Sequence, residues 1–183
     1  MKDEGAECGT GSREQEAMLK RIARLRVPLG FLFGALALGL AQPAPRSLAV
    51  GAAIAIAGEI IRIWAAGHLE KGREVTSSGP YSFTRHPLYL GSTLIGVGLA
   101  IGAGSIVVAA IVLGYLAVTL TAAIRTEEAH LTDKFGAAYP EYRAGRMSVA
   151  RPFSVERAMR NREYRAAMGV LFVLVFLGWK AYN

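Results

Sequence analysis

Several residue types are scarce in this sequence, and each shortage excludes a class of protein. Its 183 residues include a single cysteine, Cys8, so the chain has no disulfide framework and no thiolate metal site. Acidic residues are outnumbered, because 14 Asp and Glu stand against 21 Lys and Arg and leave a net charge of +7. Residues 88–124 contain no Asp, Glu, Lys, Arg or His at all. A run of that length suffices for two membrane crossings and excludes an ordinary soluble enzyme.

The rest of the composition is strongly apolar. Hydrophobic residues make up 52% of the chain, and the mean hydropathy is +0.32. We therefore predict an all-α, polytopic membrane protein with about five transmembrane helices, over residues 27–41, 48–66, 88–101, 105–124 and 166–182. Residues 1–19 are predicted to be a disordered polar tail without a removable signal peptide, and residues 20–183 a single membrane domain.

Glycines punctuate the long uncharged run and the segment that follows it. Gly102-Ala103-Gly104-Ser105 lies near the middle of the run and predicts a turn between two helices, that is, a helical hairpin. Beyond the run, Glu127, Leu131 and Phe135 recur every four residues. This period predicts that the fourth helix continues past the membrane to about Phe135, where Gly136 breaks it.

Basic residues gather on one side of the predicted membrane. With five spans, only Arg46 and Lys180 fall on the other side, which places the N-terminus in the cytoplasm and the C-terminus outside. Residues 154–165 are predicted to form a basic helix at the membrane surface. Because the positive charges flank apolar spans, we expect membrane lipids, not nucleic acid, as their partners. The expected location is a prokaryotic inner membrane.

Two polar clusters lie at the ends of the uncharged run and therefore on the same, cytoplasmic side. Residues 79–91 precede the run, and Arg125-Thr126-Glu127-Glu128 follow it. Pro87 biases His86 out of the helical conformation, which would aim the imidazole into a pocket under the preceding loop. Two plainer interpretations stay open at this point: His86 and Pro87 merely start a helix, and the two glutamates are solvated helix surface.

The same clusters resemble a known enzyme family. Gly79-Pro80-Tyr81, the segment Arg85 to Gly91, and Glu127-Glu128 with Phe135-Gly136, Tyr139 and Tyr142 are similar to the isoprenylcysteine carboxyl methyltransferase family, which is related to the phospholipid N-methyltransferases. The resemblance covers about residues 55–153. It implies an integral membrane methyltransferase that uses S-adenosylmethionine, releases S-adenosylhomocysteine and holds the donor in a cytoplasmic pocket. The chain has no glycine-rich nucleotide fingerprint, which agrees with this expectation.

The resemblance also implies roles for individual residues. The expected donor-binding residues are Val75, Thr76, Tyr81, His86, Pro87, Leu88, Tyr89 and Glu127. Their chemistry suits a sulfonium and an ammonium group, because cations are attracted to aromatic faces and carboxylates. We predict catalytic roles for Arg125, which would orient a carboxylate acceptor, and for Glu128; if the acceptor is an amine, either Glu128 or His86 would take its proton. His130 is left as a surface residue.

The acceptor stays open between several chemical classes. Ala123 stands where the eukaryotic members of the resembled family have a substrate-contacting arginine. A lipophilic or prenylated acceptor is expected to present an isoprenylcysteine-like carboxylate or, alternatively, a phospholipid amine. An isoprenylated thiol and another hydrophobic small molecule also stay open. A carboxylate is already a nucleophile near neutral pH and needs no general base. No metal site and no obligate protein partner are expected.

Two rival hypotheses concern different functions. One is a reductase related to the sterol reductases, which binds a nicotinamide cofactor through a similar histidine-containing motif. The other is a membrane scaffold or transporter in which Glu59 and Arg62 line a pathway. These two residues lie three apart on one helical face, so a neutralised internal pair is the plainer interpretation.

Overall fold

The computed structural model describes residues 28–71, 73–136, 141, 142, 144 and 151–183, and all regular structure in these residues is helical. The elements are a helix at Pro28–Leu40, α2 (Pro45–His68), the short 3-10 helix η1 (Gly79–Ser82), α3 (Pro87–Gly102), α4 (Ile106–Phe135), α6 (Val155–Arg160) and α7 (Tyr164–Tyr182). The all-α prediction is confirmed. The predicted disordered tail at residues 1–19 lies outside the described residues.

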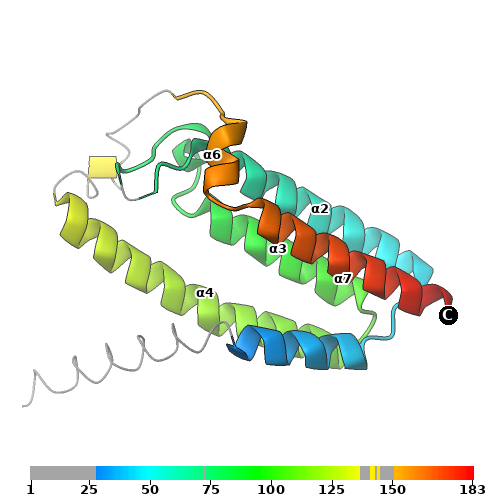
Figure 1. Cartoon of the computed structure of the whole chain (residues 1–183). Coiled ribbons are helices and arrows are strands. Elements are labelled where there is room, and N and C mark those ends of the chain that lie inside the picture. The colour runs from blue at the N-terminus through cyan, green and yellow to red at the C-terminus, as the bar shows by residue number, and fades with distance from the viewer. Residues whose placement is uncertain (1–27, 72, 137–140, 143, 145–150) are drawn as a thin grey trace, which may run out of the picture.

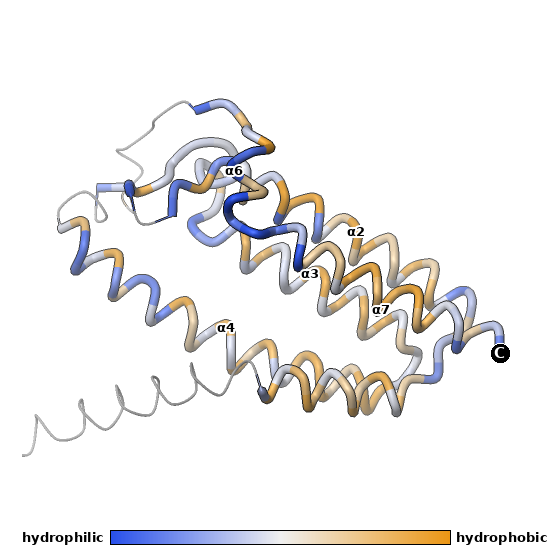
Figure 2. Tube along the Cα trace, viewed as in Figure 1, coloured by the Kyte–Doolittle hydropathy of each residue, from blue (hydrophilic) through white to orange (hydrophobic). Residues whose placement is uncertain are grey.

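Every apolar segment predicted from the sequence falls on a helix. By length and composition, α2, α4 and α7 are able to cross a membrane, whereas Pro28–Leu40 and α3 are shorter apolar helices. Figure 2 shows hydrophobic residues along these helices and hydrophilic residues around α6 and its surroundings. Burial inside the protein is low in the long helices, so most of their apolar surface faces outward, as expected in lipid.

The predicted helical hairpin is confirmed. Gly102 ends α3, and Gly104 has a φ of +63°, a conformation that glycine adopts without a steric penalty. Ser105 then caps α4, because its side chain accepts a hydrogen bond from the backbone N–H of Val108. At the other end α4 continues to Phe135 and stops at Gly136, as the sequence predicts.

The predicted surface helix over residues 154–165 is wrong in its length. The structure has a short α6 that ends at Arg160, then a turn, and α7 starts at Tyr164. The turn forms because the side-chain amide of Asn161 donates hydrogen bonds to the carbonyls of Ala66 and Leu69, both at 2.9 Å. These bonds satisfy backbone groups at the C-terminus of α2, which a continuous surface helix would leave unpaired.

Helices α2 and α3 approach each other closely at glycines on both helices. A Cβ atom on Gly58 would lie 2.7 Å from the Gly91 carbonyl oxygen, so glycine is required at this crossing. Helix α7 packs against both α2 and α3, as Figure 1 shows. Helix α4 diverges from this group toward its C-terminal end, and the Pro28–Leu40 helix contacts it through Phe33, whose ring lies 5.7 Å from that of Tyr115.

Candidate functional site

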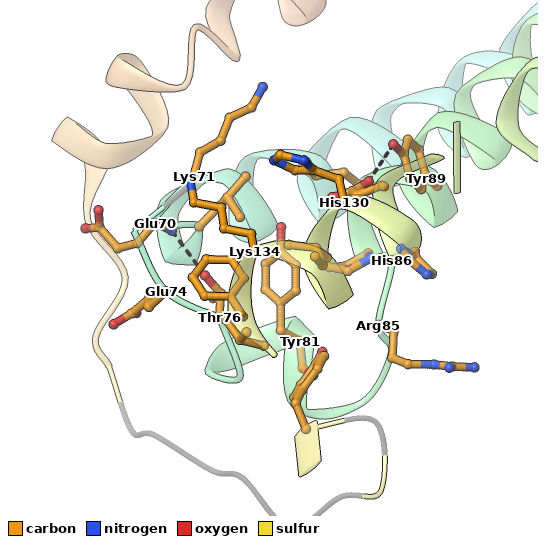
Figure 3. Close-up of a pocket in the computed structure, with 18 of the residues that line it drawn as sticks. Glu70, Lys71, Glu74, Thr76, Tyr81, Arg85, His86, Tyr89, His130 and Lys134 are labelled. Carbon is orange, nitrogen blue, oxygen red and sulfur yellow. Dashed lines mark hydrogen bonds between the residues drawn. The ribbon is translucent and has the colours of Figure 1, made fainter. Parts of the chain in front are cut away.

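A pocket of about 570 Å³ lies where the loop after α2, η1, the first turn of α3 and the last turns of α4 meet. Figure 3 shows side chains from these elements converging on it. The pocket exists because α4 is longer than α3, its partner in the hairpin. The last turns of α4 therefore extend past α3 and face the loop that follows α2. The pocket therefore lies at the end of the bundle that carries both polar clusters.

An apolar cluster closes the loop against α4. Val75 and Tyr142 are buried, and Leu131 and Phe135 of α4 pack on them. The Tyr142 hydroxyl donates a hydrogen bond of 2.7 Å to the backbone carbonyl of Tyr81, which fixes η1 beneath the pocket. Tyr142 is thus a buried part of the pocket wall, and Tyr139 of the same motif lies outside the described residues.

His68 supports the other side of this loop. Its ring Nδ1 lies 3.1 Å from the hydroxyl of Ser78, and both side chains are buried. Gly79 has a φ of +58°, and a Cβ atom there would lie 2.6 Å from the His68 ring. The loop therefore rests directly on the C-terminus of α2 and carries Thr76 and Tyr81 into the pocket.

The His86-Pro87 sequence starts α3 and also places an imidazole in the pocket wall. His86 has non-helical backbone angles, with φ −130° and ψ 58°, and Pro87 is the first residue of the helix. The His86 Nε2 lies 3.1 Å from Glu128 Oε1, and Arg85 Nη1 lies 3.7 Å from the same oxygen. His86 thus has both predicted positions: it is the N-cap residue of α3, and it also lines the pocket.

The two polar clusters meet across the pocket. The Tyr89 hydroxyl donates a hydrogen bond of 2.6 Å to Glu127 Oε2, marked by the dashed line at Tyr89 in Figure 3. This bond joins α3 to α4 although the residues are far apart in the sequence. Glu127 is exposed, so its carboxylate is accessible to a ligand in the pocket.

All of the residues predicted to bind the donor line this pocket: Val75, Thr76, Tyr81, His86, Pro87, Leu88, Tyr89 and Glu127. The predicted catalytic residues lie differently, since Arg125 and Glu128 are not among the described residues that line it. Glu128 reaches the pocket indirectly through its contact with His86, and Arg125 is exposed on α4. Their catalytic roles stay predictions.

The sequence interpretation missed further lining residues on α4 and in the loop. Ala123, His130 and Lys134 line the pocket together with Glu127. Their spacings of four, three and seven residues from Glu127, respectively, place them on one helical face, and this period would have identified them. Glu70 also lines the pocket, and its carboxylate lies 3.2 Å from Arg151, Arg157 and Arg160. No local pattern could have predicted those distant partners.

Burial favours the neutral form of the Tyr81 phenol. Burial is the main cause that raises the pKa of the Tyr81 phenol far above its ordinary value, and the Glu127 carboxylate adds to the effect. The phenol therefore stays neutral at physiological pH. The neutral phenol of Tyr81 therefore offers an O–H group and an aromatic ring to the pocket.

Comparison with known proteins decides the family. The family model described as "Phospholipid methyltransferase" matches residues 47–138, which contain nearly all of α2, the loop, η1, α3 and α4. The chain belongs to the phospholipid methyltransferase family. The matched elements are those that build the pocket, and the predicted relationship to the isoprenylcysteine carboxyl methyltransferases is confirmed at the level of this family. Membership points to a membrane methyltransferase.

Two curated proteins are similar to parts of this chain. The cobalt-zinc-cadmium resistance protein CzcN of Cupriavidus metallidurans is 31% identical over 129 residues, which cover 67% of this chain and 58% of CzcN. The nickel-cobalt-cadmium resistance protein NccN of Alcaligenes xylosoxydans xylosoxydans is 38% identical over 76 residues, covering 40% of this chain and 36% of NccN. The aligned part is thus less than two thirds of either relative. No solved structure matches the chain.

Proposed function

We propose that this protein is an integral membrane methyltransferase that uses S-adenosylmethionine to methylate a lipophilic acceptor. The observation that carries the proposal is the hydrogen bond between Tyr89 and Glu127, which unites the two sequence motifs over one pocket. The volume of about 570 Å³ lies within the range of roughly 300–1,000 Å³ usual for small-molecule sites. Family membership supports the reaction class.

The residues in the pocket fit the chemistry of the donor. Glu127 offers an accessible carboxylate to an ammonium or a ribose hydroxyl, and Tyr89 holds that carboxylate in place. Tyr81, Tyr89 and His86 supply aromatic rings that stabilise a positive charge. When bound, S-adenosylmethionine supplies an electrophilic methyl group on its sulfonium. The contribution of the chain is to align the two substrates and to exclude water from the reacting atoms.

The first acceptor class is an isoprenylcysteine-like carboxylate. Arg85 lines the pocket and is a candidate to orient a carboxylate, since a guanidinium binds both carboxylate oxygens in one plane. Ala123, at the position of the arginine in the resembled family, also lines the pocket and leaves space beside Glu127. With this acceptor the protein needs no general base.

The second acceptor class is a phospholipid amine, and one contact favours it specifically. A protonated amine must lose a proton before it attacks, and His86 lines the pocket with Glu128 3.1 Å behind it. In this arrangement His86 takes the proton and Glu128 stabilises the resulting imidazolium. The predicted role of Glu128 is then fulfilled through His86.

We further propose that the pocket faces the cytoplasm of a prokaryotic cell, with the apolar helices in the inner membrane. Basic residues support this orientation, because Lys71, Arg85, Lys134 and the arginines of α6 all lie at the pocket end of the described structure. Positive charge favours the cytoplasmic side of a membrane.

Calorimetric titration of the detergent-purified protein with S-adenosylhomocysteine tests the proposal. We expect saturable binding that Glu127→Gln weakens at least about tenfold, because a charge-assisted contact is lost. Asp133→Asn is the matched control, since Asp133 is an exposed carboxylate on the same helix that does not line the pocket. Absence of binding to the folded wild type would overturn the donor assignment and favour a scaffold or transporter.

A second experiment separates the two acceptor classes. The protein and methyl-labelled donor are incubated in two separate reactions. One contains vesicles with phosphatidylethanolamine, and the other contains a prenylated cysteine. A product whose label is released by mild base is a methyl ester, whereas a label that resists base is an N-methyl group. His86→Gln is expected to abolish the transfer to the amine, because the proton acceptor is lost. Label in neither acceptor would exclude both classes.

A further inference from the structure

Arg62 lies in α2 outside the pocket, and its guanidinium joins three helices. The Nε atom donates to Glu163 Oε1 at 2.6 Å, at the start of α7. The Nη1 atom donates to Ser92 Oγ at 2.5 Å and to the Leu88 carbonyl at 3.5 Å, both in α3. Ser92 Oγ itself donates to the same Leu88 carbonyl at 2.9 Å. One cation thus fixes the first turn of α3 relative to α2 and α7.

The surrounding chain is adapted to this guanidinium. A Cβ atom on Gly91 would lie 2.5 Å from Arg62 Cγ, so the glycine leaves room for the arginine stem. Glu163 is buried, and the residue before it, Arg162, has a φ of +60°, which is costly for a residue with a side chain. This strained turn directs Glu163 inward onto Arg62, where a regular helix through residue 162 would continue along the surface.

Glu59 is the second carboxylate near the same cation. Its Oε2 lies 3.9 Å from Arg62 Nε, and neither of its buried oxygens has a hydrogen-bond partner within the described structure. The predicted pairing of Glu59 with Arg62 therefore exists as a weak ion pair, and Glu163 is the closer partner. If Glu163 loses its charge, Glu59 is still near enough to neutralise the arginine.

We propose that Arg62, held by Glu163, is a positioning residue for the donor pocket; this inference rests on the proposed function. Leu88 lines the pocket, and the same helical turn carries His86 and Tyr89 into it. By binding the Leu88 carbonyl and Ser92, Arg62 fixes the rotation of α3 about its axis and thereby aims Tyr89 at Glu127. Small displacements of groups that hold a ligand cost much of its binding energy.

The test compares donor affinity with stability in matched variants. Arg62→Lys keeps the charge but loses the planar fork, and Glu163→Gln keeps the shape of Glu163 but loses its charge. We expect both to raise the Kd for S-adenosylhomocysteine about tenfold, and Glu163→Asp to stay within about threefold of wild type. Glu156→Gln, at an exposed carboxylate of α6, is the control and should leave the Kd unchanged.

A second measurement distinguishes positioning from a general structural role. Because Glu59 is able to neutralise Arg62, the melting temperature of ligand-free Glu163→Gln should stay within a few degrees of wild type. A loss of stability that accounts for the whole loss of affinity would overturn the proposal. If Arg62→Lys does not fold, Ser92→Ala decides: an about threefold weaker affinity supports positioning, and an unchanged one overturns it.

The outcomes also separate this inference from the proposed function. A wild-type protein that does not bind S-adenosylhomocysteine removes the donor assignment, and the positioning role falls with it. If the wild-type protein binds S-adenosylhomocysteine and the Arg62→Lys and Glu163→Gln variants bind it equally well, only the positioning role is overturned.

Discussion

The interfaces of α3 with α2 and with α4 are built differently. Toward α2 the contact is mainly backbone against backbone at glycines, with Gly58 and Gly91 in direct apposition, and it extends along the helices to Gly51 and Gly98; the Arg62 side chain adds bonds to α3. Toward α4 the helices diverge, and at the pocket end side-chain bonds join them, from Tyr89 to Glu127 and from His86 to Glu128. The α2 side is a fixed wall of the site, and the α4 side is held by bonds that a ligand can replace. Stability and ligand affinity should therefore respond to different substitutions.

The largest effect should come from breaking the fixed wall. Gly58→Leu places a side chain where a Cβ atom already lies 2.7 Å from the Gly91 carbonyl, so α2 and α3 must separate. We expect a loss of about 3 kcal/mol or failure to fold, measured as the melting temperature in detergent. Gly114→Leu is the control, because nothing lies within 4 Å of a Cβ atom there. Equal effects of the two substitutions would contradict the comparison.

A smaller and different effect should follow from opening the α4 side. Tyr89→Phe keeps the ring and removes the 2.6 Å hydrogen bond to Glu127. We expect the affinity for S-adenosylhomocysteine to fall about fivefold, because Glu127 loses its support, with a melting temperature close to that of wild type. Tyr182→Phe, at an exposed tyrosine at the end of α7, should change neither quantity. A large loss of stability in Tyr89→Phe would mean that both interfaces are structural.

The stability of the protein at alkaline pH should depend on Tyr81, which lines the pocket that α3 and α4 share. Burial raises its pKa in the folded protein, so the folded state holds the phenolic proton more tightly than the unfolded chain, whose tyrosine has a pKa of about 10. The contribution to stability is therefore complete below pH ~10 and is lost as the pH rises above that value. Melting temperatures measured from pH 7 to 11 should decline less steeply in Tyr81→Phe than in Tyr182→Phe. Parallel curves would exclude this linkage.

The smallest expected effect is a gain in stability at the turn before α7. Arg162 has a φ of +60°, which glycine adopts without strain, so Arg162→Gly should stabilise the protein by about 1 kcal/mol. Arg165→Gly, inside the first turn of α7, should destabilise it by a similar amount. Differential scanning of both variants checks the opposite signs. A loss of stability in Arg162→Gly would show that the arginine side chain matters more than the backbone.

Local chemistry made most of the fold predictable. The five apolar helices and the turn at residues 102–105 follow from hydropathy and glycine placement, which depend only on neighbouring residues. That Tyr89 and Glu127 lie at the same end of the molecule was also predictable, because two motifs at the ends of one hairpin fall on the same side of a membrane; their hydrogen bond is known only from the structure. The resemblance to a known family supplied the names of the lining residues but not their contacts.

The features that no local pattern could predict depend on distant pairs. Glu163 becomes the closer partner of Arg62 only when α7 packs on α2, and the three arginines come near Glu70 only when α6 packs on the end of α2. The break at Asn161 has the same origin, because its amide pairs with carbonyls of α2. Sequence periodicity reports which face of a helix is apolar, and it carries no information about which helix will cover that face.

The arginines that surround Glu70 have a consequence for anyone who shortens this chain to its recognisable core. The family match ends at residue 138, yet Arg151, Arg157 and Arg160 beyond that point neutralise a carboxylate in the pocket wall. A fragment that stops at the family boundary would lose Tyr142 from the pocket wall and would also leave the charge of Glu70 without these three partners. The complete wall of the proposed donor pocket therefore requires the chain at least through α6, and expression trials should be designed to that limit.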